Sequence, residues 1–384
     1  MHLPAQPTPI ATMATIATIA TLLAVATLTA ATAHAANPTP EVVARNLAHP
    51  WAVAFLPGGR FLVTERPGRL RVVEPDGRVL PPVAGVPAVA AQGQGGLLDV
   101  ITDSDFANNR MLYLCYAEPD ALNGRTNSTA LASARLSADS TRLEDPRVLF
   151  SQRPKVASNL HFGCRIVESG RTLFLTLGDR FRHAADAQTL DNHHGKVVRV
   201  LKDGGIPPDN PLVAAPRPGA LPEIWSWGHR NVQGATLGPD GQLWTHEHGP
   251  QGGDEINRPQ AGHNHGWPVV SFGKHYGGAT IGEGLTEKPG LQPPLHHWTP
   301  SIAPSGLAFV TSDRYGPAWK GSLMVGSLKF GYLARLTLAN GKVATEERLL
   351  QDRGQRVRDV RQGPDGLLYV LTDSPQGELL RLAP

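Results

Sequence analysis

The chain has 384 residues, of which 41% are hydrophobic, so it is long enough to bury a sizeable core in one large domain or two ordinary ones. Its 36 Lys and Arg residues and 33 Asp and Glu residues leave a net charge of only +3, which argues against binding to nucleic acid or to a membrane surface. The 41 Gly and 34 Pro residues suit a fold with many tight turns.

The N-terminal segment predicts export. The first 40 residues contain no Lys, Arg, Asp or Glu, and residues 10–33 are Ala, Thr, Ile, Leu, Val and Met only. Ala33-His34-Ala35 then forms a small-x-small cleavage pattern, so residues 1–35 are predicted to be a signal peptide and the protein to be periplasmic or secreted. The apolar run is also long enough for an uncleaved membrane anchor, which stays open as the alternative.

One short pattern recurs along the rest of the chain. A turn with Gly or Asn is followed by a run of apolar β-formers, which is typical of hairpins. The six copies lie at residues 58–63, 109–114, 169–175, 240–244, 320–325 and 365–370. The copies are about 45 to 80 residues apart, and one such unit cannot bury the faces of its sheet alone. Six of them therefore predict an all-β, six-bladed β-propeller over residues 36–384. Its first strand is expected near Val42 and its last at residues 377–382. A β-sandwich is the alternative, but it does not require six similar copies.

Three stretches are rich in Gly, His and other polar residues, namely 91–99, 158–165 and 228–268. On one face of a propeller such loops converge at the central channel. The third stretch is the densest, and its carboxylates, amides and Gly-Pro carbonyls suit calcium. Its histidines suit a transition metal instead, and a hydrogen-bonded loop without metal is the remaining alternative.

A histidine and an aspartate in these stretches form a candidate acid–base pair. His161 and Asp179 lie 18 residues apart, at the ends of two predicted neighbouring strands. An Asp that holds one ring nitrogen leaves the other free to act as a general base near neutral pH. Taken alone, a structural role for His161 is the default reading.

Three basic residues near the C-terminus form a candidate anion site. Lys329 stands alone, whereas Arg356 and Arg358 are two residues apart and so face the same side of an extended strand. Guanidinium groups bind carboxylates with two hydrogen bonds, so this set suits a ligand with several negative charges. A pair of surface charges is the alternative.

The two cysteines, Cys115 and Cys164, are compatible with one disulfide in an exported protein or with two buried thiols. The sequence does not decide between them. It contains no Cys-x-x-Cys pair, so it predicts neither a thiolate zinc site nor a haem attachment site.

Taken together, these stretches resemble the soluble aldose dehydrogenases of the glucose/sorbosone dehydrogenase family, which use pyrroloquinoline quinone (PQQ). The resemblance extends over nearly the whole chain after the predicted signal peptide. Its most specific pieces are residues 95–99 (GGLLD), 161–163 (HFG), 223–231 (EIWSWGHRN), 247–250 (EHGP), 253–257 (GDEIN) and 353–360 (RGQRVRDV).

The resemblance implies a role for each matching residue. His161 matches the catalytic base, which takes the proton of the sugar C1 hydroxyl while a hydride passes to PQQ, and Asp179 orients it. Gln94 and Arg230 match groups that contact the sugar and the quinone. The residues implied to hold PQQ are Asn231, Lys329, Arg356 and Arg358. Gly249 and Pro250 match carbonyl ligands of a calcium ion at the cofactor, and Glu255 matches a ligand of a second calcium.

The sequence departs from the family pattern at a few positions. Leu160 stands where relatives often carry a polar residue beside the base, and His265 stands where a Tyr is usual, which puts the second calcium site in question. Two alternatives remain beside an aldose-oxidising enzyme with an unidentified quinone or cytochrome acceptor. They are a calcium-dependent lactonase and a non-catalytic carbohydrate-binding propeller. The protein is expected to be a monomer.

Overall fold

Six antiparallel sheets make up the fold, five with four strands and one with three. The computed structural model describes residues 1–3, 5, 37–122 and 124–384, and Ala35–Pro384 form one compact unit. The predicted signal peptide lies almost wholly outside the described residues and stays a prediction. Within the described residues, no helix has the length and apolar character needed to cross a membrane.

The strands follow one another blade by blade, and the first strand of each blade is the innermost. The first two blades are β2 (Pro50–Leu56), β3 (Arg60–Glu65) and β4 (Arg69–Val73), then β5 (Leu97–Thr102), β6 (Met111–Pro119), β7 (Asn127–Leu136) and β8 (Leu143–Ser151). The third and fourth are β9 (Gly163–Ser169), β10 (Thr172–Leu177), β11 (Lys196–Leu201) and β12 (Ile224–Trp227), then β13 (Val232–Leu237), β14 (Leu243–Glu247), β15 (Asp254–Asn257) and β16 (His296–Trp298).

The fifth blade is β17 (Pro304–Phe309), β18 (Leu323–Ser327), β19 (Leu333–Ala339) and β20 (Lys342–Leu349). The sixth combines β21 (Val357–Gln362), β22 (Leu368–Thr372) and β23 (Gly377–Ala383) with β1 (Thr39–Leu47). The helical elements are single turns in the connections: α1 (Phe106–Asn109), η1 (Ala184–Gln188), α2 (Pro211–Ala214) and η2 (Gln351–Arg353).

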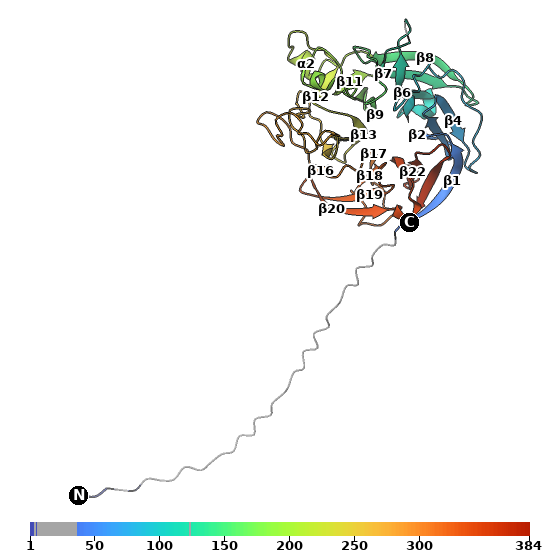
Figure 1. The fold of residues 1–384 in the computed structure, drawn as a ribbon. Coiled ribbons are helices and arrows are strands. Elements are labelled where there is room, and N and C mark those ends of the chain that lie inside the picture. The colour runs from blue at the N-terminus through green and yellow to red at the C-terminus, as the bar shows by residue number, and fades with distance from the viewer. Residues whose placement is uncertain (4, 6–36, 123) are drawn as a thin grey trace. The chain divides into compact units, whose positions relative to one another are not determined.

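The innermost strands close a ring. β2 contacts β5, β5 contacts β9, and the series continues through β13, β17 and β21 back to β2. Figure 1 shows the six sheets arranged around this common centre. β1 pairs with β23, so the last blade joins the two ends of the unit. The prediction of an all-β, six-bladed propeller is therefore confirmed, although the first strand begins at Thr39 rather than near Val42.

The six copies of the sequence pattern have one structural meaning. Each copy contains the start of the second strand of its blade, which is β3, β6, β10, β14, β18 or β22. These strands are buried along nearly their whole length, as in β14 and β22, where every residue is buried. A second strand lies inside its own sheet and is covered by both neighbouring blades. It therefore reads as a continuous apolar run rather than as an alternating one.

A buried charge network occupies the centre of the ring. Arg165 on β9 lies 3.5 Å from Asp99 on β5 and 3.0 Å from Asp359 on β21, measured between nitrogen and oxygen. Arg361 lies 2.6 Å from Asp99 and 3.2 Å from Asp359. We call these four residues the channel network. Two cations face two carboxylates, and three blades are thereby joined.

The two cysteines form a disulfide. Cys115 on β6 and Cys164 on β9 are bonded, with Cα atoms 5.7 Å apart. This decides the question that the sequence left open. The bond joins the second and third blades directly beside the His161 stretch.

Candidate functional site

A cavity of about 520 Å³ opens at one end of the central channel, a volume in the range of small-molecule sites. All six blades contribute to its wall, because the innermost strands and the loops next to them converge there. It is lined by Trp51, Arg66, Gly93, Gln94, Leu98, Phe162, Gly163, Asn231, Gln233, His248, Ala303, Leu328, Lys329, Arg356, Arg358 and Asp373. Five residues predicted as site residues are among them: Gln94, Asn231, Lys329, Arg356 and Arg358.

His161 lies directly before the lining residues Phe162 and Gly163. Its side chain is 6% exposed, and its Nδ1 lies 2.6 Å from Oδ1 of Asp179. The backbone N–H of His161 donates to Oε1 of Gln94 at 2.8 Å, which ties the histidine to the cavity wall. The structure thus brings together three residues that were predicted to act in catalysis.

The Asp179 carboxylate has a full set of donors besides His161. Oδ1 accepts the backbone N–H of Phe181 at 2.8 Å, and Oδ2 accepts the indole N–H of Trp267, also at 2.8 Å. Burial raises the pKa of Asp179, but the bond to His161 and the nearby Arg230 outweigh burial, so the net pKa is lowered. Asp179 is therefore ionised and held in one orientation.

The pKa of His161 is lowered from its ordinary value of 6.5. Burial is the largest cause, because it disfavours the charged imidazolium, and the positive charge of Arg230 acts in the same direction. Asp179 opposes both effects without cancelling them. The ring is therefore neutral near pH 7, with Nδ1–H donated to Asp179 and Nε2 left as a base.

Arg230 lies behind the cavity wall rather than in it. Its Nη1 donates to the carbonyl oxygens of His248 at 3.0 Å and Gly249 at 2.8 Å, and the guanidinium lies 5.3 Å from the ring of Trp267. Its own carbonyl accepts the backbone N–H of Asp179 at 2.8 Å. In this arrangement Arg230 connects the turn at residues 248–249 with the His161–Asp179 pair.

The cavity wall is strongly cationic. Arg66, Lys329, Arg356 and Arg358 line it, whereas Asp373 is the single lining carboxylate among the residues that the structure describes. Oδ2 of Asp373 lies 2.8 Å from Arg358 and 3.2 Å from Arg356, so both arginines face the same side, as their spacing predicted. Burial raises the pKa of Asp373, but Arg358 outweighs it and the net pKa is lowered. Four cations against one ionised carboxylate leave an excess of three positive charges.

The residues predicted to bind calcium lie on the fourth blade. The carbonyl of Gly249 accepts one hydrogen bond from Arg230, and a carbonyl oxygen has a second lone pair for a cation. Glu255 shares the amide of Asn257 with Glu247, at 3.1 Å and 3.0 Å respectively. Burial, followed by the charge of Glu247, raises the pKa of Glu255 to about 8. A buried carboxylate beside a half-buried one fits a hard cation.

His265 stands next to this group in the fold. It is buried, and its ring stacks on His229 with ring centroids 4.6 Å apart. His229 in turn binds Oε1 of Glu247 at 2.9 Å through Nδ1. Both ring nitrogens of His265 lack hydrogen-bond partners in the part of the chain that the structure describes.

Several site residues were not predicted from the sequence. Trp51, Arg66 and Asp373 line the cavity, but each stands in an ordinary strand or loop context with no motif around it. Trp267 belongs to the Gly-Trp-Pro piece of the third polar stretch, and that piece was the one available signal for its bond to Asp179. Leu160, which stands where relatives often carry a polar residue, is half-buried and does not line the cavity.

Comparisons with known proteins show what the whole chain is similar to. The chain is 45% identical over 348 residues to the aldose sugar dehydrogenase YliI of Escherichia coli K12, which covers 90% of this chain and 92% of that protein. The crystal structure of the apo-form of the soluble aldose sugar dehydrogenase from Escherichia coli matches with a TM-score of 0.86 at 44% identity, over 90% of this chain and 99% of that chain.

A further structure, the PQQ-bound form of aldose sugar dehydrogenase from Streptomyces coelicolor, matches with a TM-score of 0.71 at 26% identity, over 90% of this chain and 99% of that chain. The family model described as Glucose / Sorbosone dehydrogenase matches residues 47–381, which is nearly the whole propeller. The chain therefore belongs to the glucose/sorbosone dehydrogenase family.

Proposed function

We propose that this protein oxidises the C1 hydroxyl of aldose sugars to lactones with PQQ as the hydride acceptor. The observation that carries the proposal is a cationic cavity together with a neutral, Asp-oriented histidine whose backbone N–H is bonded to the lining residue Gln94. Relatives named as aldose sugar dehydrogenases and a neighbour with bound PQQ support the same chemistry.

The cofactor would be held by the cations of the cavity. Lys329, Arg356 and Arg358, with the Asn231 amide, face a ligand that carries three carboxylates, and the excess of three positive charges suits that ligand. When bound, PQQ supplies the hydride acceptor. Lys329 has no carboxylate partner among the described residues, so binding would not have to break an ion pair there.

His161 would act as the general base. Asp179 holds Nδ1–H, so Nε2 is left to take the proton of the sugar C1 hydroxyl. The imidazolium formed in that step would be stabilised by the ionised Asp179 carboxylate. Gln94 accepts the backbone N–H of His161 and lines the cavity, so it can position the base and contact the sugar.

Calcium would act at two places. The carbonyls of Gly249 and Pro250 would hold one ion beside the cofactor, where it acts as a Lewis acid. Glu255 would hold a second, structural ion with the buried carboxylates around it. The donor atoms are oxygens in both places, as calcium prefers.

The proposal extends to the location and partners of the protein. A signal peptide at residues 1–35 would deliver it to the periplasm or the medium, and the Cys115–Cys164 disulfide agrees with an oxidising compartment. There it would act as a monomer and pass electrons to a quinone or a cytochrome.

Reconstitution tests the function. Purified cofactor-free protein is given PQQ and calcium, and dye reduction is followed with a panel of aldoses. We expect aldose-dependent reduction that needs PQQ, and loss of most turnover in His161→Ala with PQQ binding retained. His275→Ala, at an exposed histidine outside the cavity, is the matched control and should behave as the wild type.

Two results would overturn the proposal. Absence of both PQQ binding and dye reduction would leave a carbohydrate-binding propeller. Hydrolysis of lactones without PQQ would identify a calcium-dependent lactonase. If His161→Ala lost PQQ binding together with activity, the residue would be structural rather than the base.

A further inference from the structure

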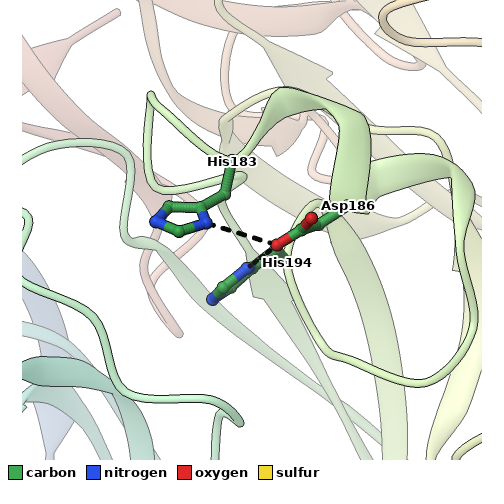
Figure 2. A group of neighbouring side chains, drawn as sticks. All are labelled: His183, Asp186 and His194. Carbon is green, nitrogen blue, oxygen red and sulfur yellow. Dashed lines mark hydrogen bonds and ion pairs between the residues drawn. The ribbon is translucent and has the colours of Figure 1, made fainter.

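Three metal-ligating side chains converge on the third blade, outside the cavity. Figure 2 shows His183 and His194 both directed at the carboxylate of Asp186. Nδ1 of His194 lies 2.8 Å from Oδ2 of Asp186, and Nδ1 of His183 lies 3.3 Å from the same oxygen. The three ligand atoms all lie within 4.8 Å of one another. We call this group the His–Asp–His cluster.

The surroundings of His194 are those of a metal ligand. Its Nε2 lies 3.2 Å from the carbonyl oxygen of Pro154, while its Nδ1 faces Asp186, and its side chain is fully buried. A neutral imidazole carries one N–H and cannot donate to both oxygens. If Nε2–H donates to Pro154, the lone pair of Nδ1 points at a carboxylate, and a cation between them would relieve the repulsion. A backbone carbonyl that fixes the ring in this way is the usual second partner of a metal-bound histidine.

We propose that His183, Asp186 and His194 bind a divalent first-row transition metal ion, with zinc as the best fit. Two imidazole nitrogens and one carboxylate oxygen form the ligand set of such ions, whereas calcium takes oxygen ligands almost exclusively. Ligands at about 2.1 Å from a tetrahedral zinc are about 3.4 Å apart, close to the 3.3 Å between His183 and Asp186.

The ion has a route to the cluster and room to complete its shell. His183 and Asp186 are each 37% exposed, and Asp186 lines an open surface cavity with Arg153, Asp191 and Asn192. The ligand nitrogens of His183 and His194 lie within 4.8 Å of each other, and the partly exposed His183 side chain can rotate to bring them closer. Water would supply the fourth ligand. No part of this argument depends on the proposed sugar oxidation.

The cluster lies on the loop that leads away from the catalytic aspartate. Residues 178–195 connect β10 to β11 and carry both Asp179 and Phe181, whose ring lies 5.3 Å from that of His161 in an edge-on contact. A metal that joins His183 and Asp186 in this loop to His194 at its end would fix the loop in shape. The ion is therefore expected to be structural, with an indirect effect on the position of Phe181.

Metal titration tests the site. Full-length protein without an affinity tag is stripped with a chelator, and zinc binding is measured by calorimetry in the absence of PQQ. Cobalt is used as a second probe, because its visible absorption reports tetrahedral coordination. We expect one equivalent of zinc and an intense cobalt spectrum. Affinity should fall at least tenfold in both His183→Ala and Asp186→Asn, two partly exposed positions where substitution spares the core.

Matched controls separate this site from other histidines. His275→Ala removes an exposed histidine from a different loop and should bind zinc as the wild type does. Zinc bound equally well by His183→Ala, Asp186→Asn and the wild type would place the ion elsewhere and overturn the proposal. So would the absence of stoichiometric binding. Because PQQ is absent throughout, failure here leaves the proposed dehydrogenase activity untouched, and failure of that activity leaves this result standing.

Discussion

The cavity wall and the channel network below it use the same residue types in opposite ways. On β21, Arg358 lines the cavity, while Asp359 and Arg361 belong to the network. In the network two cations meet two carboxylates, whereas four cations in the cavity meet one. Balanced charges buried together hold blades in place, and an excess of one sign creates a site for a ligand of the other sign. The two uses begin at consecutive residues of one strand, Arg358 and Asp359.

The clearest way to test this contrast is to unbalance the network. Arg165 is 2% exposed and faces Asp99 and Asp359. Arg165→Met should lower the free energy of unfolding by about 3–5 kcal/mol, because carboxylates are left buried with too few partners. Urea denaturation measures this change in the free energy of unfolding. Arg381→Met, which removes an exposed pair with Glu41, is the control and should cost less than about 1 kcal/mol. If both variants lost the same free energy of unfolding, the channel network would contribute no more to stability than an exposed ion pair.

The His161–Asp179 pair, as the proposed base and its orienting carboxylate, should affect activity rather than stability. Asp179→Asn keeps the shape of the side chain but no longer stabilises an imidazolium, so turnover of the PQQ-loaded protein should fall by about 100-fold or more. Dye-reduction kinetics measure it, with PQQ affinity determined separately by absorbance. Unchanged turnover would show that Asp179 only supports the loop through Phe181 and Trp267.

The cavity cations should respond in cofactor affinity alone. Lys329→Ala and Arg356→Ala each remove an exposed charge, so PQQ affinity should fall by about tenfold, or 1.4 kcal/mol, in each. Both variants should unfold at the wild-type urea concentration, in contrast to Arg165→Met. A variant that lost stability with its affinity unchanged would contradict the division between the two regions.

The smallest expected effect is on pH dependence. The pKa of His161 is lowered from 6.5, so the histidine stays neutral, and hence competent as a base, below that pH. The acidic limb of kcat/KM should therefore have its midpoint below 6.5. Asp179 raises this pKa, so the midpoint should move lower still in Asp179→Asn. A wild-type midpoint above 6.5 would mean that burial is not the dominant influence on His161.

The sequence by itself determined the architecture. The second strand of every blade is buried on both faces and begins after a turn that favours Gly or Asn, so both features appear in the residue order. The two-residue spacing of Arg356 and Arg358 likewise predicted side chains on one side, and although Arg356 lies just before β21, both contact Asp373.

The tertiary structure decided which distant residues meet. Trp51 and Arg66 from the first blade and Asp373 from the sixth complete the cavity, and Cys115 bonds Cys164 across two blades. Local sequence carries no signal for such contacts, since they depend on how the ring closes. The closing of the ring also determines which carboxylates lie next to each arginine. An arginine with a buried carboxylate partner stabilises the fold, whereas one without such a partner is available to bind an anionic ligand.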